Sequence, residues 1–597
     1  MRDNMKPCQH SLSDDVLYKD VVVIGNGPSG MVTSFMLAGN IPHLKQIPDD
    51  LPIDEMLKIR LQNLPPGQNL LEVDLMALAE GLEGRSQNPI ALLVDNLLRP
   101  CADLGIQEES LIEWRYDVEK QIEHVVLGRG PPGGAWPTFP GGVRTLSPGA
   151  WLALPPHAAV GAGGGRVPAR AVAAYCRRYV QACQLQRYFR SGVVVTSVTR
   201  APRAGPPCHV SCPRAANFWV SGYDKSAGCG FRYLCRRVVV ACGAGDRPNA
   251  LPLRVSRRAV HALADVQRAL QLLQDRGDGE KSVLVVGSGV SAADAVRLAR
   301  LAALPVRHVH RAAADSLAKL SPVAYPDYCH VYKMMLDGPT GNHPNYTPYP
   351  EHIIVDIEPV ASETSLKHKE EFDDETLQPK RVKLLNLVTN KTVEVTANLI
   401  AVLIGSKPDL FFLQTNFNLN EMDIPKECIK CMDKKDENQR LCFLKNHWNN
   451  LKSVLEQGIQ SCKSRYLNYS EINGNTDTKC LETNCNERKL SSDTEIDKSA
   501  VNCKCTHINI IPDSDKKIDC DCQPVNPYSS GIGFGVDPTK PVDGRSNPIA
   551  IDKSTHEILN APKGMYALGP VTADNFIRFI PGGAVAIVSH LHREMKE

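Results

Sequence analysis

The chain has 597 residues, 43% of them hydrophobic and 22% charged, and a formal net charge of +2 at pH 7. This length predicts large buried cores in two or more domains, and the near-neutral charge gives no reason to expect a nucleic-acid partner. The segment 1–20 is polar and no apolar run is long enough to span a bilayer, so we expect neither a leader nor a membrane span. The 20 cysteines are scattered without a secretion signal, which favours reduced thiols in a cytoplasmic protein.

A hydrophobic strand at residues 20–24 leads directly into a glycine-rich turn. The three glycines of this turn have the spacing of a dinucleotide-binding motif. The first permits the tight bend, the second lets the backbone approach a pyrophosphate, and the third packs the helix on the strand. The helix that follows directs its N-terminus at the phosphates. The cofactor-binding residues predicted in this turn are Gly25, Gly27, Pro28, Ser29 and Gly30.

The next segment, residues 40–120, interrupts the fold with a helical pattern of its own. Asn88 is a favourable N-cap and Pro89 occupies the first helical position. Apolar residues then recur at the spacing of one buried helix face, at Ile90, Leu93, Val94, Leu97 and Leu98. We predict an inserted helical subdomain with a structural role.

A second strand, 124–127, runs into a loop rich in glycine and proline that ends at Trp136. A lone tryptophan beside such a loop is not typical of ordinary core. A third buried strand, 236–243, ends at a turn of small residues, and Gly243 in this turn is predicted to bind the cofactor.

The pattern of strand, glycine turn and helix returns at residues 281–294. Ala292 stands in place of the third glycine, an exchange that helix-to-strand packing tolerates. The following strand, 305–311, ends in Arg311, where a carboxylate would select NAD and an arginine accommodates the 2′-phosphate of NADPH. Two such units indicate two nucleotides in one reaction, each at a mainly parallel sheet. With Arg311, the cofactor-binding residues predicted in the second unit are Gly287, Gly289 and Ser291.

Residues 415–531 are polar and show little periodicity, which predicts a disordered insertion. Cysteine pairs within it, such as Cys428 and Cys431, leave a zinc site open as the alternative to a solvated linker. A strand, a glycine turn and a helix at the end of the chain would close the first domain around the second. The predicted domains are a first dinucleotide-binding domain at 18–245 and 532–597, and a nested second one at 246–410.

Five segments, in this order, resemble the oxidative stress-induced growth inhibitor family, which is related to the flavin-containing monooxygenases. They are residues 25–30, 127–136, 291–295, 403–410 and 568–579. The resemblance covers most of the chain except the polar insertion, and it implies an α/β fold with an FAD domain that encloses an NADPH domain. It also implies an NADPH-dependent monooxygenase that contains FAD, uses dioxygen as co-substrate and is linked to growth, cell death and cell division.

Several residues gain a role only through this resemblance. The FAD-binding residues implied in this way are Gly133, Gly134, Trp136, Gly569, Asp574 and Arg578. The first three match a glycine-glycine-x-tryptophan element that lies along the FAD in related monooxygenases, the next two fall near the ribityl chain, and the last is an electrostatic partner for the flavin. A structural tryptophan, and an N-cap or surface charge at Asp574, stay open as alternatives. No general acid, general base or metal ligand is assigned.

Two departures from the pattern leave other functions open. The second strand of a flavin fold usually ends in a carboxylate that binds the adenosine ribose, but here Gly128 occupies that position, and Pro570 replaces the usual acidic residue after Gly569. These departures, together with a monooxygenase identifier of which only His261 fits, support the alternative of a regulatory binding protein that keeps the fold without turnover. A disulfide reductase would need a redox cysteine pair beside the flavin, and the sole Cys-x-x-Cys lies in the polar insertion.

Overall fold

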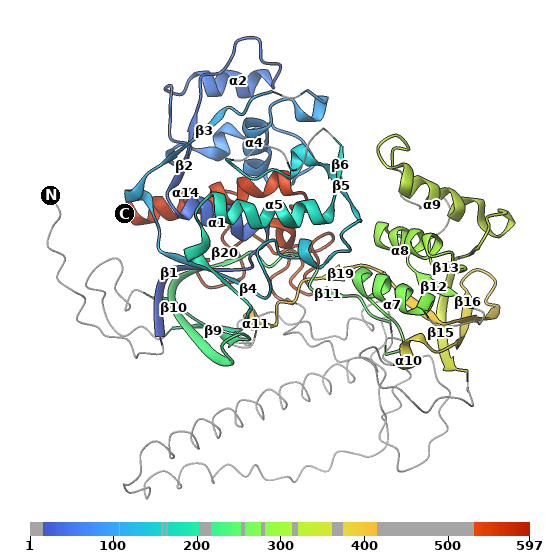
Figure 1. Ribbon diagram of the computed structural model, residues 1–597. Helices are drawn as coiled ribbons and strands as arrows, with labels where there is room; N and C mark the ends of the chain where they lie inside the picture. The colour runs from blue at the N-terminus through green and yellow to red at the C-terminus, as the bar shows by residue number, and fades with distance from the viewer. Residues whose placement is uncertain are drawn as a thin grey trace, which may run out of the picture.

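The computed structural model describes residues 16–106, 108–156, 160, 165–201, 216–251, 257–275, 281–312, 320–360, 374–414 and 531–596. The predicted disordered insertion lies outside these residues except for Gly531, and its cysteine pairs lie outside them entirely. The described chain forms two α/β units, each with its own sheet, and a helical insertion beside the first sheet (Figure 1).

The first sheet has seven strands in the spatial order β7-β4-β1-β10-β9-β8, with β20 paired to the end of β10. Its central strands run parallel and are hydrophobic throughout their carboxyl halves, because both faces of the sheet are covered. β9 and β8 extend it as antiparallel strands. The strands are β1 (Val16–Ile24), β4 (His124–Gly128), β7 (Phe189–Ser191), β8 (Val193–Arg200), β9 (Phe218–Asp224), β10 (Cys229–Val240) and β20 (Met565–Ala567).

Three helices cover one face of this sheet, namely α1 (Pro28–Leu37), α5 (Ala169–Ala182) and α14 (Ile580–Lys596). The other face packs against α11 (Phe411–Gln414) and the segment 531–571. Since β20 and α14 both follow residue 531, the chain returns to the first sheet after it has formed the second unit (Figure 1). α14 includes Gly582. Glycine is required there because a Cβ atom would overlap the Cα atom of Ala91 on a neighbouring helix.

The insertion is helical, as predicted, but it also contains two strands that we did not predict. β2 (Asn40–Leu44) and β3 (Ile112–Tyr116) form an antiparallel ribbon at its two ends. Between them lie α2 (Glu55–Gln62), α3 (Leu75–Leu78) and α4 (Pro89–Leu98). α4 begins at Pro89 after the N-cap Asn88, as expected, and packs its buried face against α14.

The second sheet has four parallel strands in the order β14-β13-β12-β18. One face carries three helices, and an antiparallel three-stranded sheet, which we did not predict, covers the other (Figure 1). The parallel strands are β12 (Val283–Val286), β13 (Val306–His310), β14 (Tyr346–Pro350) and β18 (Leu399–Val402). The covering elements are α7 (Leu263–Asp275), α8 (Val290–Leu301), α9 (Pro326–Asp337), β15 (His352–Pro359), β16 (Lys380–Asn386) and β17 (Thr392–Ala397).

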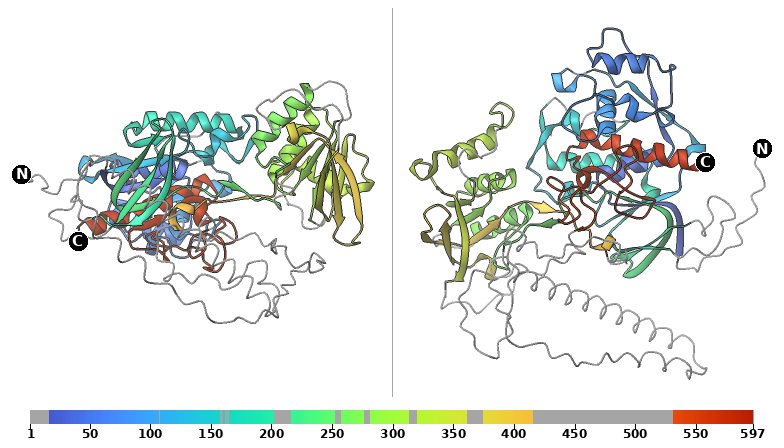
Figure 2. Two further views of the ribbon diagram at one scale, coloured as in Figure 1. Left: turned by 90° about the horizontal axis from the view of Figure 1, so that it is seen from below. Right: turned by 180° about the vertical axis from the view of Figure 1, so that it is seen from behind.

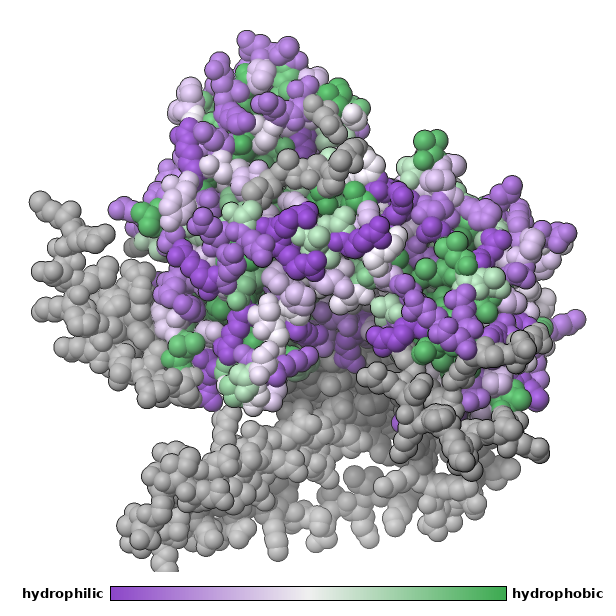
Figure 3. All heavy atoms as spheres, viewed as in Figure 1, coloured by the Kyte–Doolittle hydropathy of each residue, from purple (hydrophilic) through white to green (hydrophobic). Residues whose placement is uncertain are grey.

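Two short paired strands, β11 (Arg247–Pro248) and β19 (Ser406–Lys407), connect the two units. The second unit, coloured green to yellow, stands beside the first in both views of Figure 2. On the face shown in Figure 3, hydrophobic residues form small patches among hydrophilic ones. Among the described helices, none has both the length and the apolar character needed to cross a bilayer. This topology confirms the predicted fold class of two Rossmann-like units, the second nested in the first, while the exact domain boundaries stay predictions.

Candidate functional site

The first glycine turn connects β1 to α1 at the carboxyl edge of the first sheet. Gly25 has a φ of +118°, donates its N–H to the carbonyl of Leu127 at 2.8 Å, and has no room for a Cβ atom beside the carbonyl of Ala241. A Cβ atom on Gly30, in the first turn of α1, would overlap the carbonyl oxygen of Gly25. The protein's own backbone therefore requires glycine at the first and third positions of this motif.

The second glycine of the motif is not required by its backbone or by its neighbours. Gly27 is the N-cap of α1 with a φ of −75°, which any residue adopts, and a Cβ atom there would lie 3.5 Å from the nearest atom, the Cα of Gly134. A glycine N-cap has no side chain to bind the first-turn N–H groups, including that of Ser29 after Pro28. These groups therefore remain available to an anion.

The second glycine turn, between β12 and α8, repeats this arrangement. Gly287 has a φ of +133°, donates to the carbonyl of Val309 at 3.0 Å, and lies against the carbonyl of Leu403. Gly289 is the N-cap of α8 with a φ of −84°, and a Cβ atom on it would meet no other atom within 4 Å. Ser291 follows on the exposed side of the first helical turn. Both helices thus begin at an open N-terminus.

The loop after β4 lies directly on the first glycine turn. Gly133 and Gly134 both have positive φ angles, of +122° and +60°, and the N–H of Gly133 donates to the carbonyl of Asn26 at 2.9 Å. Trp136 follows in a short 3₁₀ turn, where it packs edge-on against Phe139 and against the core under α5. The two predicted glycines therefore lie at the first turn. Trp136 is partly buried and packs against the protein core.

Two more predicted residues reach the same edge of the sheet. Gly243 follows β10 with a φ of +77° and open space around it. Gly569 follows β20 with a φ of +80°, and a Cβ atom on it would overlap the hydroxyl of Ser29 in α1. The C-terminal segment therefore contacts the first helical turn of α1, and the roles of these residues in cofactor binding stay predictions.

The side chain of Asp574 binds the helical insertion. Its side chain is 2% exposed and accepts hydrogen bonds from the hydroxyl of Ser86 at 2.5 Å and the amide of Asn88 at 2.6 Å. Burial raises the pKa of Asp574 to about 6, against the opposing effect of these two bonds. Asn88 thus occupies the predicted N-cap position, but its side chain makes no hydrogen bond to an N–H group of its own helix and binds Asp574 instead. No local sequence pattern could indicate either contact, because Asp574 is far from Ser86 and Asn88 in the sequence.

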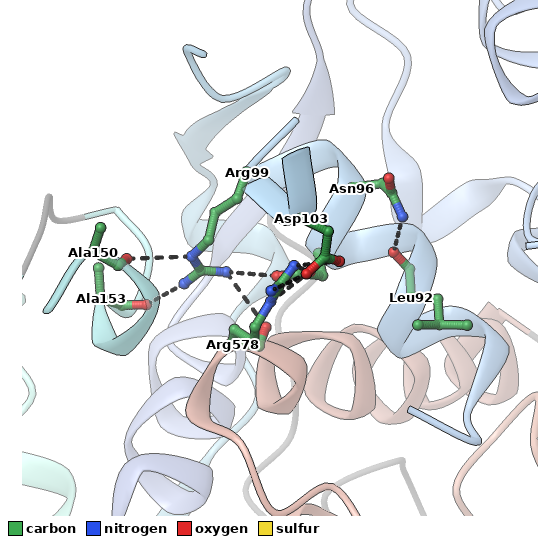
Figure 4. Close-up of polar contacts among 8 residues, drawn as sticks. Leu92, Asn96, Arg99, Asp103, Ala150, Ala153 and Arg578 are labelled. Atoms are coloured by element: carbon green, nitrogen blue, oxygen red, sulfur yellow. Dashed lines mark hydrogen bonds and ion pairs between the residues drawn. The ribbon is translucent and has the colours of Figure 1, made fainter. Parts of the chain in front are cut away.

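Arg578 likewise contacts the helical insertion (Figure 4). Its guanidinium is 3% exposed, pairs with Asp95 and with Asp103 at 2.9 Å, and stacks 4.4 Å from the ring of Trp151. Arg99 joins the network through Asp95 and through two backbone carbonyls, those of Ala150 and Ala153. These contacts favour a structural role for Arg578 over the electrostatic contact to the flavin that we expected.

β13, the strand predicted to lead to the second ribose, ends at His310 and contacts the second glycine turn. Arg311 follows the strand and is exposed. Within the strand, His308 donates from Nε2 to the carbonyl of Gly287 at 2.7 Å and accepts at Nδ1 from the hydroxyl of Tyr346 at 2.9 Å. Burial lowers the pKa of His308 to about 3, which keeps the ring neutral in this geometry. His308 was not among the predicted site residues, although it lies on the strand that leads to Arg311.

A strand, a glycine turn and an open helix N-terminus, repeated on two sheets, define a protein of the two-dinucleotide α/β class. A comparison with models of known protein families found no match. Two curated relatives named oxidative stress-induced growth inhibitor 1, from Mus musculus and Homo sapiens, are each 30% identical over 96% of this chain and cover 94% and 95% of their own lengths. The chain therefore belongs to the oxidative stress-induced growth inhibitor family, which confirms the resemblance found in the sequence.

Solved structures with a related fold are more distant. A bacillithiol disulfide reductase from Staphylococcus aureus aligns with 97% of this chain and 99% of its own, at 11% identity and a TM-score of 0.47. An FAD-bound cadaverine monooxygenase from Erwinia amylovora aligns with 71% of this chain and 85% of its own, at 12% identity and a TM-score of 0.38. We draw no functional argument from likenesses of this size.

Proposed function

We propose that the protein is an FAD- and NADPH-dependent monooxygenase that acts in the control of growth, cell death and cell division. The observation that supports this proposal is the pair of second glycines, Gly27 and Gly289. Neither has a positive φ, and neither is crowded by the protein, so glycine at both positions is explained by a ligand that approaches the backbone closely. A pyrophosphate at the N-terminus of each helix meets that requirement.

Under this proposal the first turn binds FAD and the second binds NADPH. Ser29 and Gly30 would bind the FAD pyrophosphate with their backbone N–H groups, while Gly133 and Gly134 would close over it. Arg311 would bind the 2′-phosphate of NADPH through paired, charge-assisted hydrogen bonds. When both cofactors are bound, they supply hydride transfer and the activation of dioxygen, and the protein supplies position and shielding.

Thiol chemistry is disfavoured at the first turn. Cys176 lies beside Gly133, and burial raises the pKa of its thiol to about 12. Cys242 lies two residues after the end of β10, and burial also raises its pKa. Since a thiolate is the reactive form of cysteine, neither residue is suited to the dithiol exchange of a disulfide reductase.

A second function is favoured by the orientation of two charged residues. Asp574 and Arg578, which we expected at the flavin, are both bound to the helical insertion. A regulatory protein that binds FAD without turnover would keep the glycine turns and could use these residues for stability alone. We therefore retain it as the alternative to the monooxygenase.

The two functions are separated by spectroscopy and oxygen uptake on the purified full chain. We expect bound FAD in the absorbance spectrum, its reduction by NADPH under anaerobic conditions, and NADPH-dependent oxygen uptake in air. Gly27→Val should lose FAD, while Gly289→Val should keep FAD and lose reduction by NADPH, because each valine fills one pyrophosphate position. FAD without oxygen uptake would favour the regulatory protein, and a parent protein without FAD affinity would contradict both functions.

A further inference from the structure

The end of β4 has no room for the carboxylate that usually binds the adenosine ribose. A Cβ atom on Gly128 would overlap the Cγ and Nδ2 atoms of Asn26, whose side chain is 4% exposed. Asn26 lies between the first two glycines of the first turn, so the turn itself occupies the place of the missing side chain.

Asn26 also makes two hydrogen bonds that hold the loop after β4 against the glycine turn. Its Nδ2 donates to the carbonyl of Gly130 at 2.7 Å, and its own carbonyl accepts from the N–H of Gly133 at 2.9 Å. Further along the loop, a Cβ atom on Gly134 would lie only 2.9 Å from the Cα atom of Gly27. The loop is therefore held in backbone contact with the glycine that we assign to the pyrophosphate.

We propose that Asn26 is a positioning residue for the flavin nucleotide. Its amide holds the loop 130–134 against the glycine turn so that the loop covers the pyrophosphate, and this closure takes the place of the ribose carboxylate that Gly128 cannot provide. The inference rests on the proposed function, since it assumes that the first turn binds FAD. In the second turn Ser288 occupies the position of Asn26, and Arg311 directly follows the next strand, β13.

In this proposal, the hydrogen bond from Asn26 to the loop replaces the hydrogen bonds that a carboxylate would make to the ribose. A carboxylate on β4 would accept hydrogen bonds from the ribose hydroxyls directly. The Asn26 amide instead affects FAD binding indirectly, because it holds the loop 130–134 in place. When the loop is closed, FAD dissociates only after the hydrogen bond from Asn26 to Gly130 breaks. A partly buried hydrogen bond of this kind corresponds to up to about a tenfold change in affinity.

The first test removes the amide in the full-length protein. Asn26→Ala should weaken FAD binding about tenfold and increase the dissociation rate of FAD, measured by flavin fluorescence. Asn40→Ala is the matched control, because it removes an asparagine amide that donates to the carbonyl of Phe35 at the same 2.7 Å, at the other end of α1. The control should bind FAD as the parent does. Melting temperatures without FAD should show that both variants are folded.

The second test restores the usual ribose contact. Gly128→Glu alone must displace the Asn26 side chain, so it should weaken FAD binding. In the double variant Asn26→Ala/Gly128→Glu the glutamate has room, and FAD affinity should return to within about threefold of the parent, because charged hydrogen bonds to the ribose replace the closure. A merely structural role for Asn26 would make the double variant weaker than either single one.

Unchanged FAD affinity in Asn26→Ala would overturn the inference, and so would a double variant that binds FAD no better than Asn26→Ala. Both results leave the proposed function intact, because the parent still binds FAD. A parent protein that does not bind FAD would overturn the proposed function and this inference together.

Discussion

The two glycine turns share their first two glycines and differ at the third position of the motif and at the ends of the strands that follow, where a nucleotide would be selected. Gly25 and Gly287 make the same bond to the neighbouring strand, at 2.8 and 3.0 Å, and both have positive φ angles. The ends of the strands that follow differ, because Gly128 ends the first and Arg311 follows the second. The first glycine of each turn therefore reports the fold, while the strand ends carry the information that distinguishes the two ligands.

The largest expected effect is a loss of stability on substitution at the third position of the first glycine motif. Gly30→Ala places a Cβ atom on the carbonyl of Gly25, and we expect it to lower the free energy of unfolding by about 3 kcal/mol, as overpacking in a core does. The second turn already has Ala292 at this position, so the two units tolerate different residues there.

The matched control is Gly27→Ala, whose Cβ atom has 3.5 Å of clearance. It should change stability by less than about 1 kcal/mol. Denaturation of both variants without FAD provides the measurement. Equal stability of the two variants would show that a small backbone shift relieves the close contact at Gly30. Glycine would then not be required at the third position of the first turn.

Substitution of Arg311, after the strand that we propose leads to the second ribose, should give the next largest effect. Arg311→Ala should reduce the preference for NADPH over NADH by tenfold to about a hundredfold, because a charged hydrogen bond is worth about 1.5–3 kcal/mol. The rate of anaerobic FAD reduction by each nucleotide measures this preference. Arg381→Ala, which removes an exposed arginine of β16, is the control and should leave the preference unchanged. Equal rates with NADH and NADPH in the parent would contradict the role of Arg311.

The smallest effect concerns the dependence of stability on pH. The pKa of His308 is about 3 in the folded protein and about 6.5 when unfolded, so the unfolded state gains a proton first as the pH falls. Stability is therefore lost below pH 6.5, by roughly 1.5 kcal/mol at pH 5.5.

The variant His308→Gln has no proton to take up and should lose less stability over this pH range than the parent. The measurement is the free energy of unfolding of both proteins at pH 7.5 and 5.5. His124→Gln provides the parallel test in the first unit, because burial lowers the pKa of His124 to about 4. The same loss in parent and His308→Gln would show that His308 is protonated in the folded state.

Much of the fold was predictable because it follows from local patterns. The hydrophobic strands before Gly25 and Gly287, and the helix that begins at Pro89, all lie where the sequence indicated. The ribbon of β2 and β3 and the sheet of β15 to β17 were missed, since these strands are short or half exposed and lack continuous hydrophobic runs.

The site was predictable only in part, because its remaining contacts join distant segments. Gly133 and Gly569 were expected near the first turn, and the structure places them there. No periodicity could have indicated that Asp574 binds Ser86. The network of Arg578 was hidden for the same reason, since Asp95 lies in the insertion.

The pairing of β20 with β10 makes the first sheet a late product of synthesis. On β10, residues 238–240 pair with β1 on one side and with β20 on the other, and more than half of the chain separates β10 from β20. The nested unit leaves the ribosome complete while this hydrophobic edge is still unpaired. Unpaired edges of this kind associate readily with other chains. The nascent protein therefore carries an aggregation-prone edge for most of its translation, and only the final segment of the chain removes it.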